Sequence, residues 1–185
     1  MGTNNFLVEC VLRTEPGITS GGIAGKCDDA GYALEVGPGG APRMRLRFPG
    51  GGCARTSSVA IADGRWHHVI AEVDRSAGAV HLYVDGALTD GPWSGELPED
   101  ASVANHADFT VGVVPGTDGD PAFLAGQIDF LRVSRGTLAD AETTIEQLYA
   151  WEFDGPFLRD FEGQAARGAG RDVGAVEWAP GAAGG

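Results

Sequence analysis

The sequence predicts an all-β protein: a two-sheet antiparallel β-sandwich (jelly roll) with one short C-terminal α-helix. The 30 glycines and 10 prolines divide the chain into short apolar runs separated by turn residues. Most runs alternate apolar and polar residues, which is the period of a strand with one buried face. Many short strands with regular turns are typical of a sandwich. We expect strands at residues 6–13, 23–26, 32–36, 43–48, 59–62, 66–74, 80–84, 108–113, 123–124 and 127–133.

One helix is expected, at residues 140–151. Apolar residues spaced three, four and three positions apart fall on one stripe of a helix, and here they are Leu138, Ala141, Ile145 and Leu148. Thr137 followed by Asp140 resembles a helix-capping start. We therefore assign residues 1–153 to one domain that includes this helix. Residues 154–185 form a Gly/Ala-rich extension with a few apolar anchors.

The charge balance argues against two classes of partner. The chain has 13 basic and 26 acidic side chains, a net charge of −13, so its surface should repel nucleic acid and anionic lipid. No apolar run approaches the roughly 18–20 residues that span a bilayer, so membrane insertion is not expected. The N-terminus has no basic region followed by an apolar one, so no secretion signal is expected within this chain.

The three cysteines match neither a fully paired disulfide framework nor a zinc-site spacing. Cys10 alternates with Phe6, Val8 and Leu12, which predicts a buried thiol. Cys27 and Cys53 lie beside turn residues and are able to pair only if their strands are neighbours. The redox compartment stays open.

The stretch "DGRWHHVIAEVDRSAGAVHLYVDGAL", residues 63–88, predicts a hairpin with Asp-Gly turns at both ends. One face of its two strands is apolar throughout, with Val69, Ala71, Val73, Val80, Leu82 and Val84. The same parity places His67 in the core, as an imidazole that needs one or two hydrogen-bond partners and no metal. His68, His81 and Tyr83 point outward. No base or nucleophile within reach follows from this spacing.

This hairpin resembles the signature of the laminin G-like, concanavalin A-like jelly rolls, Asp-Gly-x-Trp-His-His-Val followed by Leu-Tyr-Val-Asp-Gly. "FLVECVLRT" resembles the first strand of that family, with Cys10 and Val11 in place of the common Ala-Trp. "GGIAGKCDDAGYALEV", "NHADFTVG" and "LAGQIDFLRVSRGTL" resemble its next hairpin and its closing strands. The similarity covers residues 6–149. The segment after it is not part of the general family pattern.

The resemblance implies two antiparallel sheets, one of them concave, and a module that binds glycans or proteins. We expect a non-catalytic carbohydrate-binding, lectin-like module of a larger extracellular or periplasmic protein, with a polysaccharide or glycan as its partner. A protein-interaction or adhesion module is the first alternative, and a small polysaccharide-cleaving hydrolase or lyase is the second. Fold alone decides none of these.

The sequence argues against catalysis without closing the question. Glycoside hydrolases need two carboxylates roughly 5–10 Å apart, commonly on alternate strand positions as in Glu-x-Asp-x-Glu, and no such triplet occurs. Glu72 and Asp74 share a face, but Asp74 begins a turn. Tyr83 and His81 share an outward face, which keeps a lyase open.

The stretch "RMRLRF" offers the clearest binding surface. Met44, Leu46 and Phe48 should point into the core, so that Arg43, Arg45 and Arg47 form a stripe on the opposite face. Guanidinium groups pair well with carboxylates and sulfates, which favours an acidic polysaccharide. The alternative is a neutralised ladder, in which Glu35 on the preceding strand, with Glu9 and Arg13 on another, pairs with these arginines.

Neutral sugars are commonly held by an aromatic platform. Tyr83, Trp93 and Trp178 are the candidates. Trp93 ranks first because it lies in "TDGPWSGEL", which we expect to be an exposed loop. The alternative is a loop tryptophan folded over an edge of the sandwich.

A structural calcium ion is a further expectation, since many members of the resembling family carry one and acidic loops supply oxygen ligands. The candidate ligands are Asn105, Asp108, Asp118, Asp120 and Asp129, and "CDDAG" adds Asp28 and Asp29. Parity groups Asp129 with Leu131 and Val133, so we expect its carboxylate to be partly buried and to need a cation or hydrogen-bond donors. An acidic residue near this place often helps to hold the ion in the resembling modules.

Overall fold

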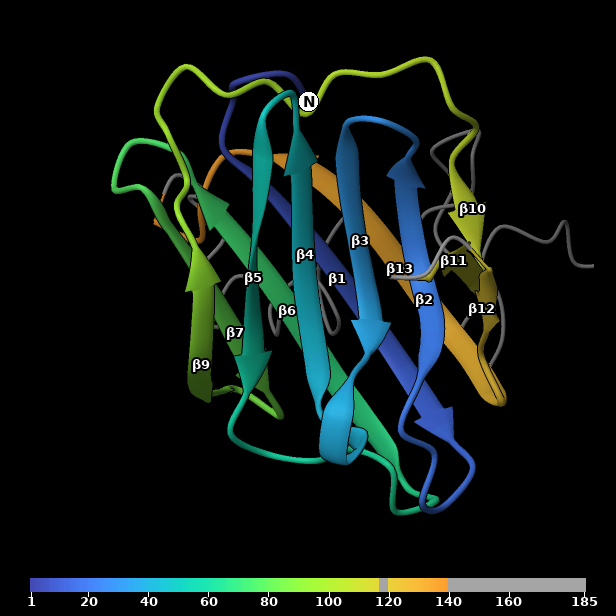
Figure 1. Cartoon of the computed structure of the whole chain (residues 1–185). Helices are drawn as coiled ribbons and strands as arrows, with labels where there is room; N and C mark the ends of the chain where they lie inside the picture. The colour runs from blue at the N-terminus through green and yellow to red at the C-terminus, as the bar shows by residue number, and fades with distance from the viewer. Residues whose placement is uncertain (117–119, 140–185) are drawn as a thin grey trace, which may run out of the picture. The chain divides into compact units, whose positions relative to one another are not determined.

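The computed structural model describes residues 1–116 and 120–139, which belong to the compact unit Met1–Asp140. Within this unit the chain forms two large antiparallel sheets packed face to face (Figure 1). The helix expected at 140–151, the extension at 154–185 and the domain boundary between them lie outside the described residues, and so do Asp118 and Trp178.

The first sheet has five strands in the order β13-β1-β6-β7-β8. These strands are β1 (Phe6–Thr14), β6 (Trp66–Asp74), β7 (Ala79–Val84), β8 (Ala87–Leu88) and β13 (Gly126–Arg135). β6 and β7 form the predicted hairpin, with Ala71 opposite Leu82. The apolar side chains of both strands point inward as expected, and the opposing sheet removes them from water.

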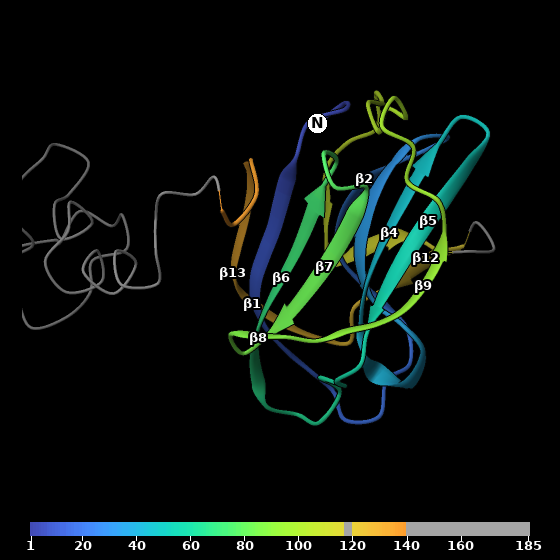
Figure 2. The same ribbon diagram turned by 90° about the vertical axis from the view of Figure 1, so that its left-hand side faces the viewer.

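The second sheet has six strands in the order β10-β2-β3-β4-β5-β9. They are β2 (Gly21–Cys27), β3 (Gly31–Val36), β4 (Pro42–Phe48), β5 (Gly51–Ser57), β9 (Asp90–Gly95) and β10 (Thr110–Val111), with the 3-10 turn η1 (Pro38–Gly40) between β3 and β4. Figure 2 shows the two layers side by side. The core between them includes Phe6, Val8, Leu12, Leu34, Met44, Leu46, Val69 and Leu82, all at most 1% exposed.

A small third sheet pairs β11 (Val113–Pro115) with β12 (Pro121–Phe123). This hairpin lies against the outer side of β2, where the chain carries glycine. A Cβ atom on Gly22 would collide with the backbone of Val114 and Ala122. Glycine at this position therefore lets the hairpin sit directly on the sheet.

Three expectations about strands are wrong. Residues 59–62 are not a strand: Ile61 is fully buried, but its amide donates to the carbonyl of Gly40 in η1 instead of a sheet partner. β5 and β9 were not expected, because "GGCARTS" and "DGPWSG" lack apolar alternation. β5 pairs with β4, and β9 pairs with β5. These backbone hydrogen bonds hold both segments as strands although their side chains show no strand pattern.

The partial burial expected for Asp129 is also wrong. The pairing of β13 with β1 shifts at a β-bulge, where Val11 faces Phe130 and the next residue, Leu12, faces Ile128. Asp129 is the unpaired extra residue of this bulge and is exposed. Because the Asp129 carboxylate is in contact with water, it needs no cation or protein hydrogen-bond donor to stabilise its charge.

All three cysteines are buried free thiols. Cys10 lies in the core as predicted, and burial, followed by the nearby Glu9, raises the pKa of its thiol to about 12. Cys27 and Cys53 lie on β2 and β5, which are separated by β3 and β4, so the condition for their pairing is not met. In the described part of the chain no helix has the length and apolarity needed to cross a membrane.

Candidate functional site

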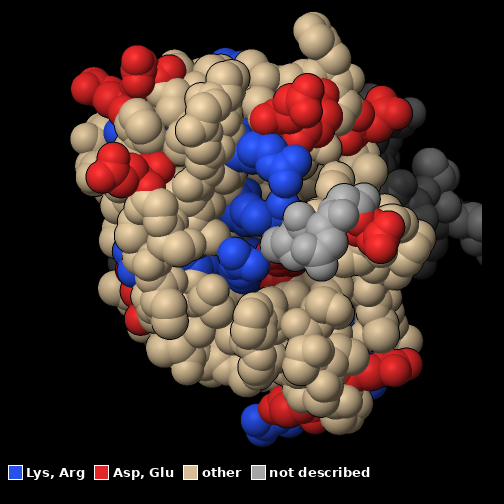
Figure 3. Space-filling view, viewed as in Figure 1, with Lys and Arg blue, Asp and Glu red and all other residues tan. Residues whose placement is uncertain are grey.

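The outer face of the six-stranded sheet carries the predicted stripe of Arg43, Arg45 and Arg47 on β4. Met44 and Leu46 between them are 0% and 1% exposed, so the alternation expected from the sequence is confirmed. Basic side chains gather in a hollow of this face (Figure 3), and the cavity there is lined by Arg43, Arg45 and Arg47.

Small residues on the neighbouring strands produce this hollow. Arg45 has Ala33 on one side and Ala54 on the other, and Arg47 lies between Gly31 and Gly52. These neighbours leave the space above the sheet open, and the cavity has a volume of about 330 Å³. We call it the arginine groove, lined by Arg43, Arg45, Leu46, Arg47, Gly51, Gly52, Cys53, Ala54 and Ser94.

Arg45 is the fixed member of the groove. It is 8% exposed, its Nη2 lies 3.2 Å from Oε2 of Glu35, and it also donates to the carbonyl of Pro115 in β11. Its Nε is buried and has no hydrogen-bond partner among residues 1–116 and 120–139. The β11–β12 hairpin therefore helps to hold this guanidinium in place.

Arg43 and Arg47 are only half-buried and less constrained. Nη1 of Arg43 lies 3.4 Å from Oε1 of Glu35, and Nη1 of Arg47 donates over 3.0 Å to the carbonyl of Asp28. Within the described part of the chain, two of the three guanidinium groups thus share the carboxylate of Glu35, and Arg47 pairs with no carboxylate. The groove keeps an excess of positive charge in a chain whose net charge is −13.

The neutralised ladder considered from the sequence is correct only for Glu35. Glu9 and Arg13 lie on β1, in the opposite sheet, where Oε1 of Glu9 lies 2.8 Å from Nε2 of His68 and its Oε2 lies 2.6 Å from Arg132. Burial raises the pKa of the Glu9 carboxyl. His68 and Arg132 lower the same pKa by a larger amount, so it lies below its usual value. Glu9 does point to an outer face, as its place in the alternation predicts. That face belongs to the five-stranded sheet, so Glu9 cannot pair with the arginines of β4.

Trp93 does not lie in a loop. It is a half-buried residue of β9, opposite Arg55 of β5, and the Arg55 guanidinium carbon lies 4.9 Å from the centre of its ring. Arg55 is held by the carbonyls of Val80 and Gly91. The ring also packs against the core, so the indole closes an edge of the sandwich, as the alternative interpretation expected.

Tyr83 lies on the outer face of the five-stranded sheet, away from the groove. Its hydroxyl donates to Oε2 of Glu72 over 3.0 Å. Burial, followed by this carboxylate, raises the pKa of Tyr83 to about 12, so the phenol keeps its proton at neutral pH. His81, which shares the outward face, lies 2.7 Å from Asp90. Tyr83 and His81 are thus each hydrogen-bonded to a carboxylate of the protein, Glu72 and Asp90 respectively.

The histidine pair is part of the wall of the sandwich. His67 is 8% exposed, with Nδ1 at 2.8 Å from Asp85 and Nε2 at 3.0 Å from Asp63. These are the one or two partners that its buried position required. Trp66, at the end of β6, is 46% exposed, and the guanidinium carbon of Arg13 lies 5.3 Å from its ring centre.

The described candidates for calcium ligands do not form a cluster. No three His, Cys, Asp or Glu side chains of the described residues gather to hold a metal ion. Asn105 instead organises its loop: its amide donates to the carbonyls of Lys26 and Val103, and its Oδ1 accepts from Ala107. Calcium binding stays a prediction, and a rise in Tm when calcium chloride is added to chelator-treated protein would support it.

Comparison with known proteins adds the following. The family model of the concanavalin A-like lectin/glucanases superfamily matches residues 11–143. A search of the curated protein sequences finds no match. Among solved structures, domains LG4-5 of the mouse laminin alpha1 chain are 20% identical with a TM-score of 0.57, over 72% of this chain and 36% of that chain.

A second similar structure is the CBM40 domain of the Ruminococcus gnavus IT-sialidase, in complex with alpha2,3 sialyllactose. It is 14% identical with a TM-score of 0.58, and the match covers 75% of this chain and 80% of that chain. At such identities both structures are evidence for the fold alone. The present chain spans little more than a third of the laminin chain.

Proposed function

Because the chain belongs to the concanavalin A-like lectin/glucanases superfamily, we propose that it is a non-catalytic glycan-binding module whose arginine groove binds an acidic polysaccharide. The ligand carries carboxylate or sulfate groups along a chain that lies over β4 and β5. The support is one observation: three guanidinium groups line one hollow, where among the described residues Glu35 pairs with two of them and no carboxylate pairs with the third.

The groove suits an anionic chain for three physical reasons. Guanidinium groups donate paired hydrogen bonds that match the geometry of carboxylates and sulfates. Arg45 is held by Glu35 and Pro115, so it loses little side-chain freedom when a ligand binds. The small side chains of Ala54 and Gly52 let a sugar ring come close to the sheet.

Arg47 is the best position at which to test ligand binding separately from folding. It is half-buried, and among the residues that the structure describes it donates to one backbone carbonyl. Arg45→Glu, in contrast, would place a second carboxylate against Glu35 and disturb the fold as well as binding. We expect Arg47→Ala to weaken binding of polygalacturonate at least about tenfold in calorimetry, the value of one charge-assisted hydrogen bond. Neutral dextran should not bind.

The matched control is Arg65→Ala, which removes the same charge from an exposed turn on another part of the surface, where Asp63 is the one partner of Arg65 among the described residues. Equal affinities of the Arg47→Ala and Arg65→Ala proteins for polygalacturonate would overturn the proposal. Equal binding of dextran and polygalacturonate to the unmodified protein would overturn its acidic specificity.

Protein recognition is a second candidate function, favoured by the outer face of the five-stranded sheet. Trp66 and Phe130 there are 46% and 42% exposed, and Phe130 faces Val11 across the β1–β13 pair. Large apolar side chains that are exposed on one face of a sheet favour contact with another protein. A change of Trp66→Ser that abolishes binding to an extracellular protein partner, with polygalacturonate binding intact, would support this role.

The proposal of a glycan-binding module includes a location outside the cytoplasm, as part of a larger protein.

A further inference from the structure

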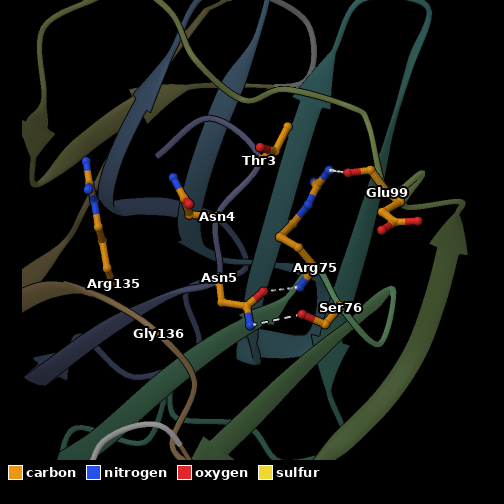
Figure 4. Close-up of a pocket in the computed structure, with 8 residues that line it drawn as sticks. All are labelled: Thr3, Asn4, Asn5, Arg75, Ser76, Glu99, Arg135 and Gly136. Atoms are coloured by element: carbon orange, nitrogen blue, oxygen red, sulfur yellow. Dashed lines mark hydrogen bonds between the residues drawn. The ribbon is translucent and has the colours of Figure 1, made fainter.

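A second cavity lies at the end of the sandwich near the N-terminus and shares no residue with the arginine groove. Four separate segments build it: the N-terminal stretch, the β6–β7 turn, the connection after β9 and the end of β13. Its volume is about 460 Å³, within the range of about 300–1,000 Å³ typical of small-molecule sites. We call it the end pocket, lined by Thr3, Asn4, Asn5, Arg75, Ser76, Glu99, Arg135 and Gly136 (Figure 4).

The residues that line the end pocket are polar. Every lining residue except Gly136 carries a hydroxyl, amide, carboxylate or guanidinium group, and none is aromatic or aliphatic, although carbon atoms make up part of the wall. A wholly apolar ligand would desolvate these polar groups at a cost. The ligand that fits is small and hydrophilic on all sides.

One wall of the pocket is held in place by hydrogen bonds. Oδ1 of Asn5 accepts from the amide of Arg75 over 2.7 Å, and its Nδ2 donates to the hydroxyl of Ser76 over 3.4 Å. Nη2 of Arg75 donates to the carbonyls of Pro98 and Glu99 over 2.8 and 3.2 Å, and to that of Ala101. The wall is therefore formed before any ligand arrives.

Arg75 also has unused hydrogen-bonding capacity. It is only 4% exposed, and its Nε and Nη1 are buried without a hydrogen-bond partner among the residues described here. No carboxylate of the described residues forms an ion pair with it, although the charge of Asp100 acts on it from a greater distance. A buried cation with unpaired donors is unfavourable and raises the local positive potential.

Arg135 supplies a second and more accessible cation. It is the last residue of β13, opposite Phe6, and is exposed. It forms no hydrogen bond or ion pair with the described part of the chain. Figure 4 shows Arg135 and Arg75 on two sides of the pocket, with Thr3 and Asn4 drawn between them. Two arginines and one glutamate give the pocket a net positive charge in an acidic protein.

We propose that the end pocket binds a single sugar acid, with its carboxylate on Arg135 and its hydroxyl groups on Asn4, Thr3 and Ser76. A guanidinium fork pairs with a carboxylate, and side-chain amides and hydroxyls exchange hydrogen bonds with a polyol. This site is independent of the arginine groove and adds a monosaccharide-sized subsite at one end of the sandwich.

The test uses D-glucuronate as the probe and the isotope-labelled whole chain, followed by NMR. We expect glucuronate to shift the side-chain amide signals of Asn4 and Asn5 and the backbone amides of Ser76 and Gly136, while D-glucose shifts none of them. Arg135→Gln should weaken this binding at least about tenfold, because it removes the charge and one fork of donors. Arg65→Gln, an exposed change outside both cavities, is the matched control and should leave the affinity unchanged.

Binding of polygalacturonate by the Arg135→Gln protein separates this proposal from that of the groove, since the groove contains none of the altered residues. Absence of shifts at these four positions in millimolar glucuronate would overturn the proposal. So would equal shifts with glucose, or an affinity for glucuronate that Arg135→Gln does not change.

Discussion

Nδ1 of His67 lies 2.8 Å from Oδ2 of Asp85, and the other oxygen of the same carboxylate accepts from the amide of His68. The second ring nitrogen of His67 lies 3.0 Å from Asp63. One imidazole therefore joins the turn that precedes β6 to the turn that follows β7. This contact joins the two strands at the open end of the hairpin, opposite the β6–β7 turn.

Stability should fall as the pH rises from 6 to 8. Burial lowers the pKa of His67, but its hydrogen bonds to Asp85 and Asp63 raise it more, so the folded pKa lies above the value of about 6.5 in the unfolded chain. The stabilisation is present in full below the unfolded pKa and is lost as the pH rises through the folded pKa. Thermal unfolding at several pH values should give a falling Tm, and His67→Gln should flatten this slope. His106→Gln, a change of the exposed loop histidine, is the control and should keep it.

Asp85→Asn should be milder than Asp85→Ala. Asp85 has a φ of 51°, in the left-handed region that asparagine tolerates better than alanine, and an asparagine oxygen still accepts from the amide of His68. Both changes lose the charge next to His67. We expect alanine to cost about 1 kcal/mol more than asparagine in urea unfolding. Equal midpoints for the two variants would contradict this account of the turn.

Glu35→Gln should strengthen binding of polygalacturonate. Glu35 is the one carboxylate paired with the groove arginines in the described part of the chain, and it repels an anionic ligand. A charge about 6 Å away in water is worth about 0.7 kcal/mol, or about threefold in affinity. Calorimetry at two salt concentrations should show a larger gain at low salt. A loss of affinity would mean that Glu35 acts mainly by positioning Arg45.

Gly22→Ala should destabilise the fold by about 2 kcal/mol, because the added methyl group collides with the backbone of Val114. It should also loosen the β11–β12 hairpin from the sheet, and with it the bond from Arg45 to Pro115. Chemical unfolding measures the first effect. Gly51→Ala is the comparison, since a Cβ there would meet only Phe48 at an ordinary distance of 3.5 Å.

Residue alternation determined which face of each strand is apolar. This information is local, because successive side chains of a strand point to opposite sides whatever the strand pairs with. The inward parity of Met44 and Leu46, the outward stripe of arginines and the buried position of His67 could all be predicted in this way. Strands without an apolar pattern, such as β9, gave no such signal, so Trp93 was assigned to a loop.

The tertiary structure decided which segments are neighbours, and this depends on pairing between distant parts of the chain. A bulge against β1 exposed Asp129, strand order separated Glu9 from the groove, and a glycine at position 22 admitted the hairpin that holds Arg45. The end pocket arises where four segments meet, so no single stretch of sequence contains it. A period of two residues encodes the face of a strand, whereas a site depends on the packing of strands that alternation does not specify.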